Sequence, residues 1–381
     1  MAVTTALNVA AMTMWSPILP LILRDLGASD FQVSLSVATW TAVAALFQYQ
    51  GGIWSDRWGR RPTLVYPTYA CAVAISAAAF MPSWRPFVLA YILWYAANAI
   101  QGPTFSTIIG EAVPPERHGH AFGLVEFSIG VGVVAGPLLG AYLLPLVRAR
   151  GLLLITGATF LCTAVARHML LRETRPASAG TLHFRFTHIF SGRLAVVLLI
   201  SVAYNLVISV TMWGPFLALH ASDAMGLSKS QINVFYAAGS AVSALCSLLA
   251  GRALSRWGVY RVLSWSTLAL GGTVLIWSLQ RHLLAIAAGM LAVSAAFQFS
   301  MVASDAFRVV ALPETIRGRA LGAIGTASSL AAAVAVPLAG YLRERLALAP
   351  FVLAAATAVV LFVAVQVLVA RDLTPAARSR A

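Results

Sequence analysis

The sequence predicts an all-α integral membrane protein in which twelve spanning helices form two pseudo-symmetric six-helix bundles. Composition, the spacing of apolar runs and an internal repeat predict this fold. Of the 381 residues, 60% are hydrophobic and 10% are charged, against roughly 45–50% and 25% in soluble domains. So few charges cannot cover the surface of a soluble protein of this length. An ordinary soluble enzyme, a disordered chain and a coiled coil are therefore excluded.

Apolar runs long enough to cross a bilayer recur along the chain, with short polar segments between them. The first six predicted spans are 2–23, 31–51, 63–81, 86–108, 120–144 and 151–171. The next six are 194–219, 230–250, 262–280, 283–304, 320–342 and 350–370. The expected organisation is therefore an N-terminal bundle at 1–171, a linker at 172–193, a C-terminal bundle at 194–370 and a tail at 371–381.

The basic residues are grouped between the apolar runs, and they predict the orientation in the membrane. The net charge is +14, and the segments on the side of the linker and tail hold 18 of the 26 basic residues. Basic loops stay in the cytoplasm. Both termini and the linker are therefore expected to be cytoplasmic, in the inner or plasma membrane. This placement also argues against nucleic-acid binding, despite the basic composition.

The two halves resemble each other at an offset of 199 residues. The offset aligns the segment at Gly27 and Ser29 with Gly226 and Ser228, and it aligns Gly59 with Gly258. Single matches arise by chance, but a series at constant offset indicates a duplication of six helices. Parallel halves of this kind suit alternating access to a central site.

The loop after the second predicted span reads Gly-Ile-Trp-Ser-Asp-Arg-Trp-Gly-Arg-Arg-Pro from Gly52 to Pro62. Here the sequence resembles the major facilitator superfamily, whose signature loop has the same glycines, Asp-Arg pair and two basic residues. With the repeat, the resemblance covers essentially the whole chain. In that family the loop is a cytoplasmic latch between the halves. The resemblance implies this role for Gly52, Asp56, Arg57, Gly59, Arg60 and Arg61.

Each residue type in the loop has a physical use. Gly52 is expected to permit close approach of helices and Gly59 a tight turn. Asp56 is expected to pair with an arginine or to face a helix N-terminus. The alternative interpretation is a solvated basic turn that serves topology alone. In the second half Ser255 replaces the aspartate, so the latch is expected to be one-sided.

The fifth span carries glycines at intervals of four residues, Gly132, Gly136 and Gly140, with Pro137 beside them. Glycines at this interval share a helix face and let another backbone pack closely. The pattern is similar to the fifth-span motif of family exporters. The alternative is helix packing without directional meaning.

The fourth span departs from the exporter pattern. Drug–proton antiporters of the family carry an arginine three residues before a Gln-Gly pair, and here Asn98 precedes Gln101 and Gly102. No other basic residue lies in the middle of a predicted span. Arginine-assisted proton antiport is therefore not what this span predicts.

Few acidic residues fall inside the predicted spans. Glu126 stands in the fifth span, and an acid there is costly unless it faces a cavity or a partner. Either proton carriage or a structural hydrogen bond is open for it. Asp305 stands three residues before Arg308, a spacing that favours an ion pair within a helix. Both acids are candidates for ion coupling.

Polar and aromatic residues at helical spacing predict a substrate cavity. Residues on one face recur every three to four positions, and the family lines its pathway with the first, fourth, seventh and tenth spans. The candidates are Asn8, Trp15, Trp94, Asn98, Gln101, Tyr204, Asn205 and Gln298. Helix packing is the alternative role for each of them.

Together these features predict a secondary transporter, acting as a monomer, that moves a small organic solute by alternating access. The fifth-span motif and the uncharged lining favour export of an amphiphilic compound. An importer or facilitator of a neutral nutrient is the first alternative, and a membrane sensor or assembly factor that has lost transport is the second. No phosphate-binding loop, catalytic constellation or metal-ligand spacing is visible, so no cofactor and no enzyme activity are expected. Protons, sodium or no ion remain open as coupling partners.

Overall fold

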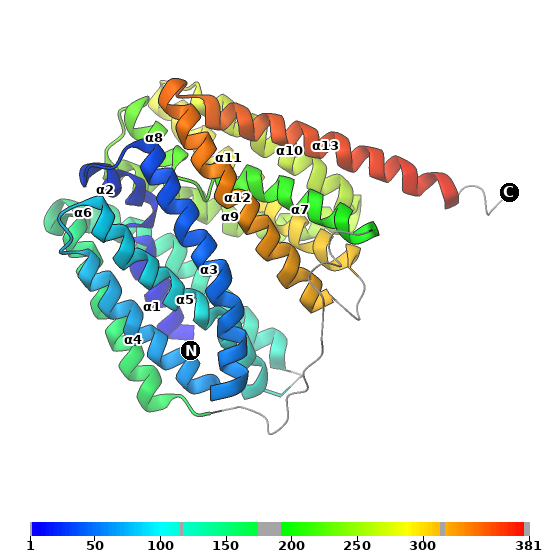
Figure 1. Cartoon of the computed structure of the whole chain (residues 1–381). Coiled ribbons are helices and arrows are strands. Elements are labelled where there is room, and N and C mark those ends of the chain that lie inside the picture. The colour runs from blue at the N-terminus through cyan, green and yellow to red at the C-terminus, as the bar shows by residue number, and fades with distance from the viewer. Residues whose placement is uncertain (1, 115–116, 174–191, 313–316, 377–381) are drawn as a thin grey trace. The chain divides into compact units, whose positions relative to one another are not determined.

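The computed structural model describes residues 2–114, 117–173, 192–312 and 317–376. This part of the chain is helical, and no strand occurs in it (Figure 1). The contacts divide the chain into unit 1, Met1–Leu182 with Leu227–Ala237, and unit 2, His183–Gly226 with Ala238–Ala381. Most of the predicted linker, 172–193, and the last residues of the predicted tail lie outside the described residues.

Unit 1 contains the first six predicted spans. Its helices are α1 (Ala2–Thr13), the 3₁₀ turn η1 (Ser16–Ile18), α2 (Leu19–Asp25), α3 (Asp30–Trp58), α4 (Arg60–Ala78), α5 (Trp84–Ala112) and α6 (His118–Leu170). The long α6 holds the fifth and sixth spans and is broken at Arg148, where φ is 57°. A positive φ is strained for a residue with a side chain, and it reverses the chain between the two spans. Helix α1 packs on α6, and α5 packs on α3 and α4.

Unit 2 contains the remaining spans. Its helices are α7 (Gly192–Val210), α8 (Phe216–Asp223), α9 (Lys229–Trp257), α10 (Val259–Ser278), α11 (Leu283–Ala311), α12 (Arg317–Arg345) and α13 (Ala349–Ala376). The first residues of α9, up to Ala237, belong to unit 1 by their contacts. Helix α10 packs on α11 and α13, and α7 packs on α12 and α13.

Eight of the described helices are long and apolar enough by themselves to cross a bilayer. The segment Gly123–Leu170 is counted once among them although it contains two spans, and the apolar helix Leu194–Val210 is shorter. Helices α4 and α5 are less apolar and are not among the eight. With α1 to α2 and α7 to α8 each as one interrupted span and α6 as two, the described helices make the twelve crossings that the sequence predicts.

The internal repeat is visible in the backbone. Among the described residues four glycines have positive φ, namely Gly27, Gly59, Gly226 and Gly258, and the offset of 199 relates them in pairs. The start of α3 is closed by reciprocal bonds between Ser29 and Gln32, at 2.9 and 3.3 Å. Ser228 and Gln231 repeat both bonds at the start of α9, at the same distances. The two halves therefore use the same turns and the same capping box.

The glycine row of the fifth span lies directly against the first span. A Cβ at Gly132 would come within 2.8 Å of Ala6 O, and one at Gly136 would meet Thr13 Oγ1 and Ala10 O. The hydroxyl of Thr13 also donates to Gly132 O at 3.1 Å. The glycines thus allow the close backbone approach that their spacing predicts, and the partner is α1.

The first span is interrupted just above this contact. Pro17 has no N–H to donate, and Ile18 N donates to Trp15 O at 3.1 Å as in a 3₁₀ turn. The carbonyl of Met14 is left without a helical partner, and Asn233 Nδ2 donates to it at 2.8 Å. A Cβ at Gly140 would overlap the same carbonyl. The break, the glycine row and Asn233 therefore form one contact within unit 1.

The glycine row gives a stability prediction. Gly136→Ala should destabilise unit 1 by about 1–3 kcal/mol, because the added methyl group overpacks the contact with α1. The measurement is the midpoint of thermal unfolding in detergent. Gly130→Ala is the matched control on the same helix, because nothing lies within 4 Å of a Cβ there. An unchanged midpoint for Gly136→Ala would contradict the packing.

Candidate functional site

The junction of α3 and α4 is held by an acid from beyond the sixth span. Gly59 separates the two helices with φ of 107°, a value that favours glycine. The carboxylate of Glu173 accepts from Arg60 N at 2.7 Å and from Arg61 N at 3.1 Å. It therefore caps the N-terminus of α4, where the helix dipole favours a negative charge.

The side chain of Arg60 is buried beneath this junction. Its Nε and Nη2 donate to Glu111 Oε1 at 3.3 and 3.2 Å, and Nη1 donates to Ser55 Oγ at 2.9 Å. Arg61 Nη2 donates to His168 O at 2.6 Å. The signature loop is therefore tied to the ends of α5 and α6.

Glu111 and Glu173 are residues that the sequence reasoning missed. The signal was present in the charges, because three arginines of the loop face a single aspartate, and buried guanidinium groups need further acceptors. Acids near the same ends of the fourth and sixth spans were the available candidates.

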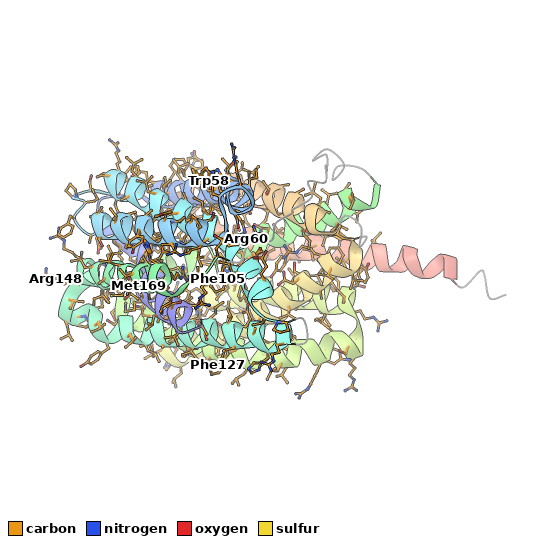
Figure 2. The ribbon with its side chains drawn as sticks, turned by 90° about the horizontal axis from the view of Figure 1, so that it is seen from below. Trp58, Arg60, Phe105, Phe127, Arg148 and Met169 are labelled. Atoms are coloured by element: carbon orange, nitrogen blue, oxygen red, sulfur yellow. The ribbon has the colours of Figure 1, made fainter. Side chains whose placement is uncertain are left out.

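Among the other residues of the signature loop, Gly52 differs from expectation and the side chain of Asp56 is not described. No atom lies within 4 Å of a Cβ at Gly52, whereas one at Gly51 would meet the backbone of Ile100. The close approach predicted at Gly52 is thus wrong by one residue, because Gly51 is the glycine that faces α5. The side chain of Asp56 lies outside the described residues. Arg57 is exposed, and Trp58 is exposed whereas Arg60 is buried (Figure 2).

An aromatic cluster fills unit 1 around the predicted cavity residues Trp15 and Trp94, both fully buried. Trp15 Nε1 donates to Thr156 Oγ1 at 2.9 Å. The ring centroids of Trp15 and Trp94 are 5.9 Å apart, and those of Tyr91 and Trp94 are 5.2 Å apart. The buried Trp94 Nε1 has no hydrogen-bond acceptor among the described residues. The two predicted tryptophans are therefore brought together from α5 and the break after α1.

Two other candidates of unit 1 point to neighbouring helices. Asn8 is buried, and its Oδ1 accepts from Thr163 Oγ1 at 2.9 Å. Gln101 is buried, and its Oε1 accepts from Thr68 Oγ1 at 2.8 Å and from Arg167 Nη1 at 2.9 Å. Asn98, three residues earlier on α5, is exposed. Gln101 thus holds neighbouring helices together within the bundle.

Arg167 is one of the 18 basic residues that the orientation count assigned to the cytoplasmic side, yet its side chain is buried within unit 1. Its exposed fraction is 7%. Its Nη1 donates to Thr68 Oγ1 at 3.0 Å as well as to Gln101. The reason is direction: a helical side chain leans toward the helix N-terminus, so this guanidinium enters the bundle although its Cα is near the end of α6.

The candidates of unit 2 lie on α7 and α11. Tyr204 is buried, and the half-buried Asn205 accepts at Oδ1 from Ser209 Oγ at 3.1 Å. Gln298 is half-buried on α11. Trp213 is 58% exposed and meets Phe297 edge-on, with centroids 6.4 Å apart.

The two coupling candidates have different surroundings. Asp305 forms the ion pair that its spacing predicts, with Arg308 Nη2 2.7 Å from Asp305 Oδ1. Glu126 is exposed on α6, next to the exposed Phe127 (Figure 2). Among the described residues Glu126 has no ion-pair partner.

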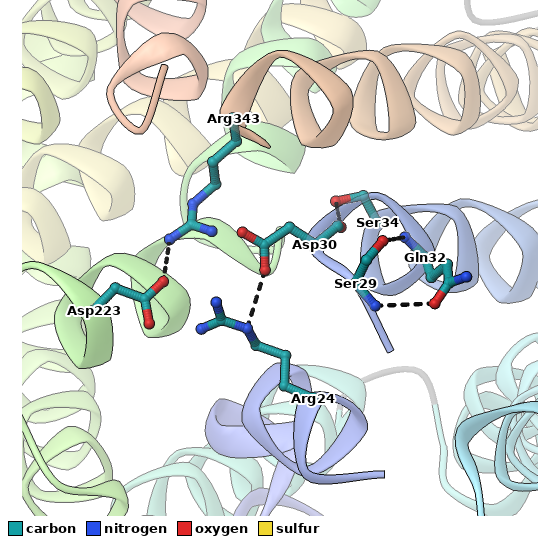
Figure 3. Close-up of polar contacts among 7 residues, drawn as sticks. All are labelled: Arg24, Ser29, Asp30, Gln32, Ser34, Asp223 and Arg343. Carbon is teal, nitrogen blue, oxygen red and sulfur yellow. Dashed lines mark hydrogen bonds and ion pairs between the residues drawn. The ribbon is translucent and has the colours of Figure 1, made fainter. Parts of the chain in front are cut away.

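Each unit has further ion pairs. In unit 1, Arg24 Nε is 3.1 Å from Asp30 Oδ1 (Figure 3), and Lys229 pairs with Asp25. In unit 2, Arg343 Nη2 is 2.8 Å from Asp223 Oδ2. Within the described ranges no group of three or more His, Cys, Asp or Glu side chains is placed to hold a metal ion.

Relatives of known name share parts of this sequence. The chain is 24% identical over 245 residues to the multi-drug resistance efflux pump PmrA of Streptococcus pneumoniae serotype 4. That match covers 62% of the chain and only 60% of the length of the relative. The chain is also 26% identical over 336 residues to a chloramphenicol resistance protein of Pseudomonas aeruginosa, covering 83% of the chain and 79% of that protein.

Solved structures share the fold. A bacterial homologue of the human lysosomal transporter Spinster, in an inward-facing and occupied conformation, matches with a TM-score of 0.77 at 15% identity, covering 96% of this chain and 94% of that one. A variant of the nucleoside transporter NupG matches with a TM-score of 0.78 at 15% identity, covering 96% and 98%. The model of the Major Facilitator Superfamily matches residues 1–221 and 205–381. The chain therefore belongs to the Major Facilitator Superfamily.

Proposed function

We propose that this transporter is a secondary active exporter of an amphiphilic organic compound. The observation that carries the proposal is the row of Gly132, Gly136 and Gly140, which packs directly on the broken first span. This row is similar to the fifth-span pattern of family exporters, and here it meets the first span, which carries Trp15 in its break. The efflux pump and the resistance protein among the relatives support the same direction of transport.

The side chains support an amphiphilic cargo with an aromatic body. Trp15, Tyr91 and Trp94 supply large apolar surfaces in unit 1, and Trp213 with Phe297 supplies them in unit 2. Aromatic pairs prefer edge-on and offset contacts, which an aromatic ligand can extend. Asn98 is proposed to add an amide group to the lining in unit 1, and Asn205 and Gln298 are proposed to add amide groups in unit 2. The cycle alternates the access of this lining between the two sides of the membrane, with the loop Gly52, Asp56, Arg57, Gly59, Arg60 and Arg61 as the cytoplasmic latch.

The coupling ion in this proposal is the proton, and Glu126 carries it. An exposed carboxylate within a membrane span can gain and lose a proton as its surroundings change. Asp305 is the weaker candidate, because its carboxylate is engaged in an ion pair with Arg308. The protein acts as a monomer in the plasma membrane, with both termini in the cytoplasm, as the distribution of basic residues predicts.

Transport by the purified protein in liposomes tests the function. A panel of neutral, anionic and cationic aromatic compounds is offered with an imposed pH gradient and without one. We expect at least one amphiphilic compound to accumulate only with the gradient and in the direction that corresponds to export. Accumulation in the opposite direction would favour the importer, and no transport of any compound would favour the transport-inactive sensor.

The latch gives a prediction about rate. Glu111→Gln should slow transport by about tenfold, because the buried Arg60 loses its charged acceptor. Asp56→Asn should act in the same direction, while both variants insert into the membrane normally. Initial transport rates at equal reconstituted amounts are the measurement. Arg281→Gln is the control, since this exposed arginine donates to the carbonyl of the preceding residue, Gln280. A wild-type rate for Glu111→Gln would remove Arg60 from the latch.

Coupling gives a second prediction. Glu126→Gln keeps the shape and hydrogen bonding of the side chain but cannot titrate. Accumulation driven by the pH gradient should fall to the level seen without a gradient, while exchange of labelled for unlabelled solute continues. Asp305→Asn is the matched comparison and should keep most of the accumulation. Undiminished accumulation by Glu126→Gln would leave this residue without a coupling role.

A further inference from the structure

The interior of unit 1 contains a guanidinium group that no carboxylate of the described residues neutralises. Arg167 is buried, and its two hydrogen bonds go to neutral acceptors, the hydroxyl of Thr68 at 3.0 Å and the amide oxygen of Gln101 at 2.9 Å. Within the described residues no acid lies at ion-pair distance from it. The other deeply buried arginine of the bundle, Arg60, has Glu111 as its partner.

The charged group lies well inside the helices. Its acceptor Thr68 stands about 12 Å along α4 from the first residue, Arg60, at 1.5 Å per residue. An arginine near the end of a spanning helix normally extends its head toward the interface. Arg167, one turn before the end of α6, points the other way. Ionisable groups held in this manner inside a membrane bundle are a mark of function, because burial of an unpaired charge is costly.

One edge of the guanidinium, formed by Nε and Nη2, makes no hydrogen bond among the described residues. Both bonds use Nη1, and Nε is buried without an acceptor. The edge formed by Nε and Nη2 is a fork that matches the two oxygens of a carboxylate. Gln101 cannot turn to serve it, because its Oε1 already accepts two bonds and its Nε2 donates to Ala97 O at 3.3 Å.

The same group adjoins the aromatic cluster. Gln101 Nε2 contacts Cys71 Sγ at 3.6 Å, and Cys71 Sγ in turn donates to Trp94 O at 3.5 Å. Trp94 Nε1 is a second buried donor without an acceptor among the described residues. This part of unit 1 therefore has donors in excess and an apolar aromatic surface beside them. A ligand that suits it brings negative oxygen atoms on an aromatic body.

We infer that Arg167, positioned by Thr68 and Gln101, binds the carboxylate of an amphiphilic aromatic cargo. The inference deepens the proposed export function, on which the identification of the ligand as cargo rests. Nε is covered in this conformation, and the carboxylate reaches the fork when α4, α5 and α6 shift during the cycle. The cargo is thereby narrowed from amphiphilic compounds in general to aromatic acids.

Equilibrium binding to the full chain in lipid nanodiscs tests this site without requiring transport. The probes are 1-naphthoate and 1-naphthamide, which share the ring system and differ in charge. The wild type should bind the acid about tenfold more tightly than the amide, as the loss of one charged hydrogen bond predicts. Arg167→Lys should keep part of this preference, because the charge remains and the fork is lost. Arg167→Gln should abolish it.

Gln101→Glu is the decisive variant, because it gives Arg167 an internal carboxylate in nearly the same shape. The preference for naphthoate should disappear while the thermal midpoint of the protein stays equal or rises. A purely structural role for Arg167 predicts a preference that this variant leaves intact, and that result would overturn the inference. Equal binding of acid and amide by the wild type would do the same.

A further arm separates cargo from free anions. Acetate in excess should compete poorly, because it lacks the aromatic body. Competition equal to that of naphthoate would identify a site for small free anions and overturn the assignment to cargo. Acid-selective binding in a protein that moves no compound would refute the proposed export but not the site. Transport of neutral compounds without acid-selective binding would refute the site and support the proposed transport.

Discussion

The structure depends on one constraint: a lipid bilayer offers no water to hydrogen-bond the backbone, and a polar side chain left there without a partner in the protein is costly. Unit 1 shows how specific the solutions are. The carbonyl that the break after α1 leaves free is met by Asn233, and the indole N–H of Trp15 is met by Thr156. Asn8 and Gln101 are satisfied by Thr163 and Arg167. Each bond joins helices that are far apart in the sequence, so polar residues determine which helices pack together and in which register.

The same constraint explains the charges at the junction of α3 and α4. The loop concentrates arginines where a helix ends, and their guanidinium and backbone donors need anions. Glu111 supplies one for the buried side chain of Arg60, and Glu173 supplies one for the first backbone N–H groups of α4. Glu111 lies on α5, and Glu173 follows the end of α6. The conformation of the loop therefore depends on the positions of both acids. The proposed latch requires this dependence.

Sequence reasoning predicted what depends on residue type and spacing. The twelve spans, the glycine row and the ion pair of Asp305 with Arg308 follow from patterns along one helix. It failed where the position of a side-chain head differs from that of its Cα. Counting residues placed Arg167 near the membrane surface, whereas its side chain leans into the bundle. It also failed where partners are distant in sequence, as with the acids Glu111 and Glu173. It failed again at Gly51 and Gly52, because a shift of one residue along a helix changes the face on which a glycine lies.

The repeat has a consequence for assembly. Both halves have glycines with positive φ at matching positions, the same capping boxes and several helices of the same length. Their backbones are therefore similar in these features. A nascent chain therefore inserts two sets of helices that could pair with the wrong set. The polar bonds differ between the halves: Trp15 with Thr156 in one, and His220 with the carbonyl of Ser278 in the other. In a bilayer a mismatched helix would leave such donors unsatisfied. These polar pairs therefore make packing between helices of different halves costly.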